Sequence, residues 1–223
     1  MKISAILCAY NEGERIEKVL EILTSYFKFE DIIIVNDGYT DNTDEKILKF
    51  TDPRIKYLKN EKNMGKGFSM DRAMEEAASN IIFFADADIK GLSHNHIDKI
   101  LEPVITQEKD MCIGMRDRNI YAIPGVLKYF TPLLGGERAI IKDLWKKIPY
   151  NYKRRFQIEV ALNFYAKYFG KGYTYFTINV RHLFKEKKYG FIKGSIYRIW
   201  MYFDMIFAYF NLYSKFLFKK YFK

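Results

Sequence analysis

Short apolar runs that alternate with helical stretches most strongly limit what this chain can fold into. Near-continuous apolar runs predict strands at residues 2–8, 31–37, 54–58, 81–87 and 110–115. Amphipathic or capped stretches predict helices at residues 13–27, 40–50, 63–79 and 94–108. Because strands without polar alternation are covered on both faces, the pattern predicts an α/β fold whose mostly parallel, Rossmann-like sheet is flanked by helices.

After residue 116 this regular pattern loosens. Residues 116–140 contain two prolines and a Gly-Gly pair, which predict a loop or lid over a substrate. A helix is expected at 156–170, ending at a glycine, and a β-rich segment at 171–183. We therefore expect one domain over 1–183, with a nucleotide-binding half (1–116) and an acceptor-side half (117–183), followed by a tail over 184–223.

The positive charge of the chain is concentrated in this tail. The formal net charge is +10, but ten Lys/Arg and two acids lie between Arg181 and the C-terminus, a net of +8. These basic residues alternate with bulky apolar ones, which disfavours nucleic-acid binding. Cys8 and Cys112 lie in apolar stretches and are expected to be reduced, which predicts a cytoplasmic chain. The opening residues become polar too soon for a signal peptide.

Charged side chains follow four of the predicted strands. Since parallel strands end at one edge of the sheet, this edge is expected to gather Glu12, Asp37, Lys66, Asp86 and Asp88. Carboxylates alone would repel one another, but with a lysine and a divalent cation they form a diphosphate site. Residues i and i+2 of an extended chain point the same way, so Asp86 and Asp88 can address one ion and a neighbouring ribose. The competing interpretation is that this pair caps the next helix.

Four short motifs occur in order across residues 2–90: A-Y-N-E, V-N-D-G-x-T-D-x-T, N-x-G-K-G and D-A-D. This series resembles the nucleotide-sugar glycosyltransferases of the GT-A fold, in the large family-2 group. A less specific match, LGGERAI (134–140) with IEVALN (158–163), resembles the acceptor-side region of the same group. That group includes enzymes that glycosylate phosphoglycerate or lipid phosphates. The sequence departs from the usual pattern at Cys8, Asn36 and Tyr39.

The resemblance implies roles for individual residues. Nucleotide-sugar contacts would come from Ala9, Tyr10, Glu12, Asp37, Gly65, Lys66, Asp86 and Ala87. Among them, Asp37 would bind the pyrimidine ring, and Lys66 the diphosphate side. The metal, Mg²⁺ or Mn²⁺, would be held by Asp88 with Asp86 and with His182 from a late strand. A surface position for His182 remains open.

An inverting transferase needs a carboxylate near the acceptor hydroxyl to take its proton. Glu159 is the first choice and Glu137 the second. In a retaining enzyme, neither needs to be a base, and both could bind sugar hydroxyls. Alternatively, Glu159 faces solvent on its helix, and Glu137 forms a helix-start salt bridge with Arg138.

The tail predicts an apolar amphipathic helix, with 14 aromatic residues among 189–223. Its longest charge-free run, Met205 to Ser214, is far shorter than the roughly 20 residues that a spanning helix needs. Polar or small residues form one narrow stripe that includes Asp204, Ala208, Asn211 and Lys215. Three places are open for the broad apolar face: the catalytic domain, a second subunit, or the surface of a membrane.

Together these features predict a metal-dependent transferase that moves a sugar from a nucleotide-diphosphate donor, expected to be UDP-linked. The acceptor would be a hydroxyl or phosphate of a sugar, a lipid phosphate or a small molecule. The alternatives are a sugar-phosphate nucleotidyltransferase, whose Gly-rich Arg-Lys signature CAYNEGER lacks, and a non-catalytic membrane-binding scaffold. The expected location is the cytoplasm, with peripheral attachment to the inner face of the cell membrane left open.

Overall fold

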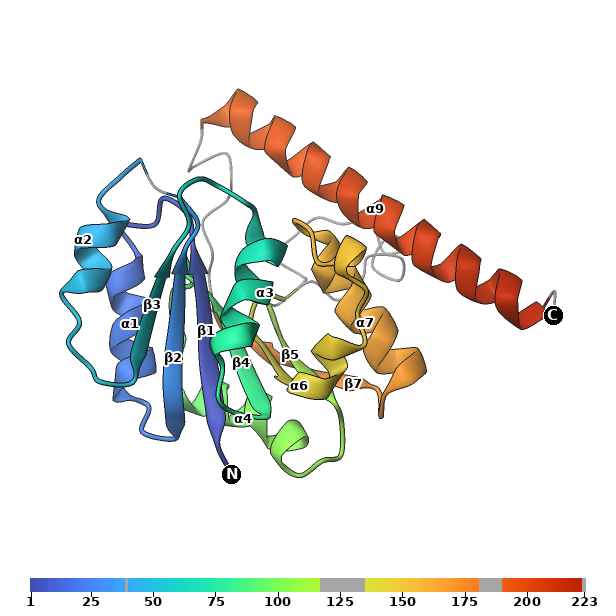
Figure 1. Cartoon of the computed structure of the whole chain (residues 1–223), viewed down its shortest axis with the longest axis horizontal. Coiled ribbons are helices and arrows are strands. Elements are labelled where there is room, and N and C mark those ends of the chain that lie inside the picture. Colours follow the sequence, from blue (N-terminus) through green and yellow to red (C-terminus); the bar gives the residue numbers. More distant parts are fainter. Residues whose placement is uncertain (39, 117–134, 181–189, 222–223) are drawn as a thin grey trace.

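The computed structural model describes residues 1–38, 40–116, 135–180 and 190–221. A seven-stranded sheet in the order β3-β2-β1-β4-β6-β5-β7 forms the centre of the molecule (Figure 1). Strand β6 is antiparallel to both of its neighbours, and the other paired strands are parallel. The strands are β1 (Ile3–Ala9), β2 (Phe29–Asn36), β3 (Ile55–Lys59), β4 (Ile81–Asp86), β5 (Met111–Arg116), β6 (Arg138–Ile141) and β7 (Tyr173–Ile178).

Helices cover both faces of the sheet. They are α1 (Ile16–Ser25), α2 (Thr43–Leu48), α3 (Lys66–Glu76), α4 (His94–Ile105), α6 (Lys142–Lys146), the 3₁₀ turn η2 (Tyr150–Tyr152), α7 (Gln157–Phe169) and α9 (Phe191–Tyr221). Helices α1 and α4 pack on one face, where they meet Leu7 and Phe83. Helices α3, α6 and α7 pack on the other face, where they meet Ile6 and Phe84. Successive residues of a strand therefore enter two separate cores, which explains the near-continuous apolar runs.

The predicted α/β fold is confirmed, with five strands and five helices close to their expected positions. The late strand expected within 171–183 is also present, as β7. The short strand β6 was not predicted, because it covers only four residues and begins with Arg138. The alternative of a helix-start salt bridge at this place is wrong, since Arg138 is the first residue of a strand.

Helix α9 lies along α7 at the edge of the molecule (Figure 1). Its contacts there are largely aromatic: Phe164 and Tyr168 of α7 meet Tyr213 and Phe216 of α9, with ring centroids 4.4–5.8 Å apart. Ala208, in the middle of the predicted polar stripe, is fully buried. One predicted resting place of the tail, the catalytic domain, therefore accounts for part of its apolar surface. In the described part of the chain, no helix is both long and apolar enough to cross a membrane.

Some predictions fall outside the described residues. Of the lid expected at 116–140, residues 117–134 are not described, and residues 138–140 belong to strand β6 instead. The predicted metal ligand His182 and the predicted division at 183 fall within the undescribed range 181–189. Cys8 and Cys112 both carry free thiols, as expected. Burial raises the pKa of each thiol to about 12, so the reactive thiolate is scarce at neutral pH.

Candidate active site at the carboxyl edge of the sheet

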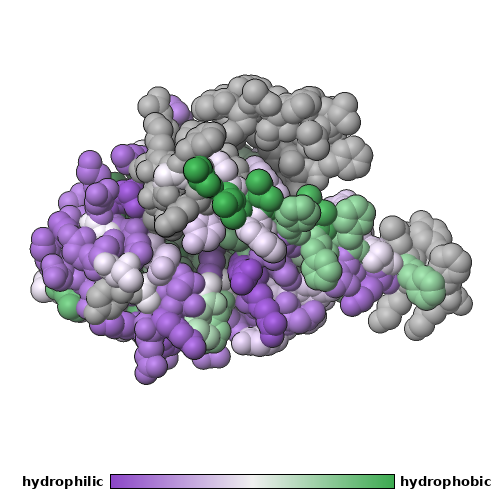
Figure 2. Space-filling model, turned by 90° about the horizontal axis from the view of Figure 1, so that it is seen from above, coloured by the Kyte–Doolittle hydropathy of each residue, from purple (hydrophilic) through white to green (hydrophobic). Residues whose placement is uncertain are grey.

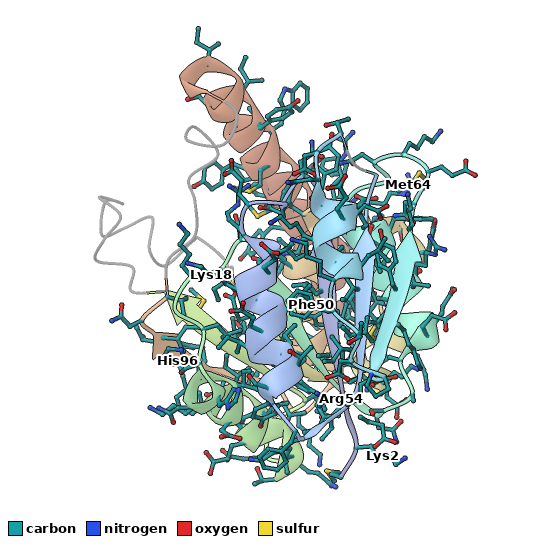
Figure 3. The ribbon with its side chains drawn as sticks, turned by 90° about the vertical axis from the view of Figure 1, so that its left-hand side faces the viewer. Lys2, Lys18, Phe50, Arg54, Met64 and His96 are labelled. Atoms are coloured by element: carbon teal, nitrogen blue, oxygen red, sulfur yellow. The ribbon has the colours of Figure 1, made fainter. Side chains whose placement is uncertain are left out.

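The residues after β1, β2, β3 and β4 meet at one edge of the sheet. Figure 3 shows Met64, from the loop after β3, at this upper edge, with Lys2 and Arg54 at the opposite end. Asn11 ties the first two loops together, because its amide exchanges two hydrogen bonds of 2.9 Å with the backbone and hydroxyl of Thr40. Asn11 has a φ of 53°, a left-handed conformation that asparagine tolerates better than most residues. Hydrogen bonds therefore hold the loops after β1 and β2 together at this edge.

Glu12, predicted to contact the nucleoside, is buried and supports the loop that follows β1. Its Oε2 accepts a hydrogen bond of 2.7 Å from Nε of Arg15, and its backbone N–H donates to the hydroxyl of Thr43. Burial opposes the charge of Arg15, but the carboxylates of Glu12, Asp88 and Glu14 outweigh it and raise the Arg15 pKa. The guanidinium of Arg15 is thus a fixed cation within electrostatic reach of Asp88.

Asp37 organises the loop between β3 and α3. Its Oδ1 accepts from the amide of Asn60 and the backbone N–H of Met64, and its Oδ2 accepts from the N–H of Gly65, each at 2.8 Å. Gly65 has a φ of 90°, which side chains other than hydrogen rarely permit. The described contacts thus engage both oxygens of Asp37 in holding Gly65 ahead of Lys66. Its predicted contact with a pyrimidine stays a prediction.

Lys66 joins the two parts of the site. As the first residue of α3, it places its Nζ 2.9 Å from Oδ1 of Asp86 and 2.9 Å from Oε1 of Glu159. Burial disfavours the ammonium, but the two carboxylates outweigh burial and raise the Lys66 pKa. The side chains of all three residues are at most 27% exposed, so water screens this triad only in part. A cation held between two carboxylates from distant segments is the central feature of the edge.

Asp86 lies against a glycine that has no room for a side chain. A Cβ built on Gly136 would lie 1.8 Å from Oδ2 of Asp86 and 2.2 Å from its Cγ. Because β6 runs antiparallel to β4, the residues just before β6 lie beside the end of β4, which brings Gly136 under the carboxylate. The Gly-Gly pair in LGGERAI is thus part of the seat of Asp86.

Arg138 is a functional candidate that the motifs did not indicate. Its side chain is almost fully buried, and the guanidinium donates to the backbone oxygens of Gly135 (2.6 Å) and Glu159 (3.3 Å) and to Oδ1 of Asn163 (2.9 Å). Burial lowers the Arg138 pKa, against the carboxylates of Glu159, Asp86 and Glu137. These hydrogen bonds connect the first part of α7 to the residues that precede β6. Arg138 thus fixes the position of Glu159 relative to Gly136.

Apart from His182, which lies outside the described residues, the remaining predicted residues also lie at or near this edge. Ala9 ends β1 and pairs with Asn36, Tyr10 follows it half-buried, and Ala87 and Asp88 form the turn after β4. Both predicted catalytic acids are buried, since Glu159 is 8% exposed and Glu137 is not exposed at all. The interpretation of Glu159 as a solvent-facing residue is therefore wrong.

The carboxylates of Asp86 and Asp88 offer hard oxygen donors of the kind that Mg²⁺ and Mn²⁺ accept. No three His, Cys, Asp or Glu of the described segments lie together in a way that could hold a metal. The protein could thus contribute two carboxylates, leaving other coordination positions for oxygens of a substrate or water. The donor set fits a divalent cation that is bound together with a phosphate.

Comparison with known proteins points in the same direction. Glycosyltransferase AglD of Haloferax volcanii is 29% identical over 52% of this chain, and the match spans 20% of that protein. Dolichyl-phosphate beta-glucosyltransferase ALG5C of Trichomonas vaginalis is 34% identical over 50% of this chain and 37% of its own length. The chain thus matches well under half the length of these two relatives.

Among solved structures, glucosyl-3-phosphoglycerate synthase from Mycobacterium tuberculosis has the same fold. That structure, a complex with Mn²⁺, UDP-glucose and glycerol 3-phosphate, superposes with a TM-score of 0.75. The superposition covers 95% of this chain and 79% of the synthase at 17% sequence identity, which shows a shared GT-A fold. A family model described as glycosyl transferase family 2 matches residues 4–169. Because this match covers well over half of the chain and includes the four strand-end motifs and Glu159, the chain belongs to glycosyl transferase family 2.

Proposed function

We propose that this member of the family transfers a sugar from a UDP-linked donor to an acceptor hydroxyl or phosphate, with Mg²⁺ or Mn²⁺. The observation that carries the proposal is the triad of Asp86, Lys66 and Glu159 at the carboxyl edge of the sheet. It sets a cation between a carboxylate suited to a metal–diphosphate complex and a carboxylate suited to the acceptor. The solved relative bound to Mn²⁺ and UDP-glucose supports the choice of donor and metal.

Different residues at the edge would bind different parts of the donor. Ala9, Tyr10 and Glu12 would line the nucleoside, with Asp37 beside the base. Gly65 and Lys66 would face the diphosphate, because backbone N–H groups and an ammonium at the start of α3 favour an anion. Asp86 and Ala87 would meet the ribose, and Asp88, with Asp86 and His182, would hold the metal. When bound, the metal would neutralise charge on the departing diphosphate.

The acceptor side would be formed by the first turn of α7 and the entry of β6. For a hydroxyl acceptor in an inverting reaction, Glu159 would take the proton as the hydroxyl oxygen attacks the anomeric carbon. Glu137 is the second candidate for this role, and its complete burial requires the acceptor to reach inside the edge. Until the donor binds, Lys66 compensates the charges of Asp86 and Glu159.

Calorimetric titration with UDP tests this proposal directly. We expect UDP to bind in the presence of Mn²⁺ and much more weakly in its absence. Asp88→Ala should lose the Mn²⁺-dependent part of UDP binding while its circular dichroism spectrum and unfolding midpoint stay near those of the parent. The absence of UDP binding with and without Mn²⁺ would refute the proposal, and Mn²⁺-dependent binding by Asp88→Ala would refute the metal role. Screening nucleotide-sugars for slow hydrolysis would then identify the donor.

A further inference from the structure

Helix α9 carries a line of exposed, large apolar side chains that we call the apolar ridge. It consists of Ile192, Ile196, Ile199, Phe203, Ile206 and Phe210, which are 49–74% exposed. Their spacing of three and four residues places them on one side of the helix. The ridge is about 27 Å long at 1.5 Å per residue, and Trp200 and Phe207, each 62% exposed, lie beside it.

The ridge is not the side by which α9 packs on the domain. Met205, Ala208 and Leu212, which are at most 5% exposed, belong to the core shared with α7. Asp204, the acid nearest to the middle of the helix, has a side chain that is only 21% exposed. The helix thus keeps its acid towards the protein and presents its apolar side outward, the reverse of an ordinary surface helix.

The ridge lies on the same side of the molecule as the carboxyl edge of the sheet. In Figure 1, the strands β1, β2 and β4 point upward towards the level at which α9 crosses. Figure 2, which looks down on that upper side, shows a band of hydrophobic side chains running along α9, whereas the rest of the visible described surface is mostly hydrophilic. A flat apolar partner placed on the ridge would therefore also face the site.

The tail that carries the ridge is basic in sequence. Ten of the 37 Lys/Arg lie between Arg181 and the C-terminus, with only two acids. Arg155 connects this region to the site: its side chain is 69% exposed, its NH1 lies 4.0 Å from Asp204, and its Cγ is close enough to touch a Cβ built on Gly65. A partner that suits both the exposed ridge and the basic sequence of the tail offers apolar groups together with anionic ones.

We propose that the apolar ridge binds the surface of an anionic lipid bilayer and presents the carboxyl edge to an acceptor that is a lipid monophosphate. This inference rests on the proposed transferase function, which it deepens. Aromatic and aliphatic side chains would enter the headgroup region, and the basic residues of the tail would meet anionic headgroups. A second copy of the chain fits less well, because an isologous contact would place two strongly basic tails side by side.

Transfer of a sugar to such an acceptor needs no general base. A phosphate oxygen forms a bond to the anomeric carbon of the sugar, and the bond from that carbon to the β-phosphate oxygen of UDP breaks. UDP departs with the electron pair, and a dianionic phosphate has no proton to lose. Glu159 would then serve to hold Lys66, while Arg155 would attract the phosphate towards the edge.

Flotation with vesicles tests the surface. The full chain should float with vesicles of phosphatidylcholine and phosphatidylglycerol, and far less with phosphatidylcholine alone. The ridge variant replaces Phe203 in the ridge and Phe207 beside it with serine (Phe203→Ser with Phe207→Ser). It should lower the partition coefficient about 25-fold, because each half-buried ring contributes about fivefold. The matched control is Phe27→Ser with Leu48→Ser, two side chains that are 82% and 62% exposed outside α9 and should not affect binding.

Equal flotation of the ridge variant and the parent, or binding that ignores phosphatidylglycerol, would overturn the proposal. The proposal would also be overturned if the parent did not float and light scattering showed it to be a dimer that the ridge variant dissociates. Hydrolysis of the UDP-sugar in solution separates the two proposals, since the ridge variant should match the parent there. It should instead lose transfer to a prenyl monophosphate carried in the vesicles. A parent that floats but neither binds nor hydrolyses UDP-sugars would refute the transferase proposal, and the lipid acceptor with it, but not the binding of the ridge to the bilayer.

Discussion

Replacing Lys66 with methionine keeps most of the volume of the side chain and removes the ammonium between two carboxylates. Because Asp86 and Glu159 each lie 2.9 Å from Nζ, their nearest oxygens are no more than about 6 Å apart. At an effective dielectric constant of about 20, two unit charges at that distance repel by about 3 kcal/mol. The loss of two partly buried ion pairs adds to this repulsion energy. The variant no longer has to bury an ammonium group, which offsets part of the total cost. We expect Lys66→Met to lower the free energy of unfolding by about 2–4 kcal/mol at neutral pH.

The pH dependence of this loss identifies its cause. In the variant, the facing carboxylates share a proton up to a higher pH when folded than when unfolded. A carboxyl group whose pKa is higher in the folded than in the unfolded state stabilises the fold. This contribution is complete below the unfolded pKa of about 4 and is lost as the pH rises through the folded pKa. The difference in unfolding free energy between the variant and the parent should therefore be clearly smaller at about pH 5.5 than at about pH 7.5.

Urea unfolding at the two pH values measures this difference. Lys153→Met is the matched control, because Lys153 forms a comparably buried ion pair of 2.7 Å with the single carboxylate of Asp71. The free energy of unfolding that Lys153→Met loses should be nearly the same at about pH 7.5 and at about pH 5.5, because Asp71 faces no second carboxylate that would repel it. A Lys66→Met loss that is as independent of pH as that of the control would refute the repulsion argument.

Two further substitutions test the frame around the triad. Gly136→Ala would push the carboxylate of Asp86 out of its seat, so we expect a stability loss of about 1–3 kcal/mol and a large loss of UDP binding. The same change in an Asp86→Ala background should cost little stability, and an equal cost in both backgrounds would contradict the clash. Arg138→Met would leave the oxygens of Gly135, Glu159 and Asn163 without this donor, so we expect a loss of about 2–4 kcal/mol in urea unfolding. Unchanged unfolding would show that Arg138 does not fasten α7.

The sequence was sufficient to predict the regular parts of the fold. Runs such as IIFFAD are apolar because both faces of the strand are covered, and that local signal survives in any tertiary context. The same reasoning placed Glu12, Asp37, Lys66, Asp86 and Asp88 at one edge, since parallel strands share their direction. No local signal could show that Lys66 contacts Glu159, which is 93 positions away.

The unpredicted features depend on long-range contacts. Strand β6 has four residues, too few for a period to be recognised, and its pairing partners are 25 or more positions away along the chain. Arg138 can be buried because the backbone oxygen of Glu159 and the side-chain oxygen of Asn163, both in α7, accept its hydrogens, which composition cannot show. For α9, the helical pattern was clear, but which side meets α7 depends on the aromatic surface of α7.

The reversed direction of β6 has a consequence for how this protein can change. Strand β5 ends at Arg116 on the carboxyl edge, and because β6 runs backwards, the chain enters it at that same edge. The connection from Arg116 to Gly135 therefore starts and finishes beside the site. A connection with both ends at one edge can be lengthened, shortened or exchanged without shifting the register of a strand, at a small cost in closure entropy. The sheet and the other loops at its carboxyl edge can thus stay constant while the stretch that enters and leaves beside the site varies.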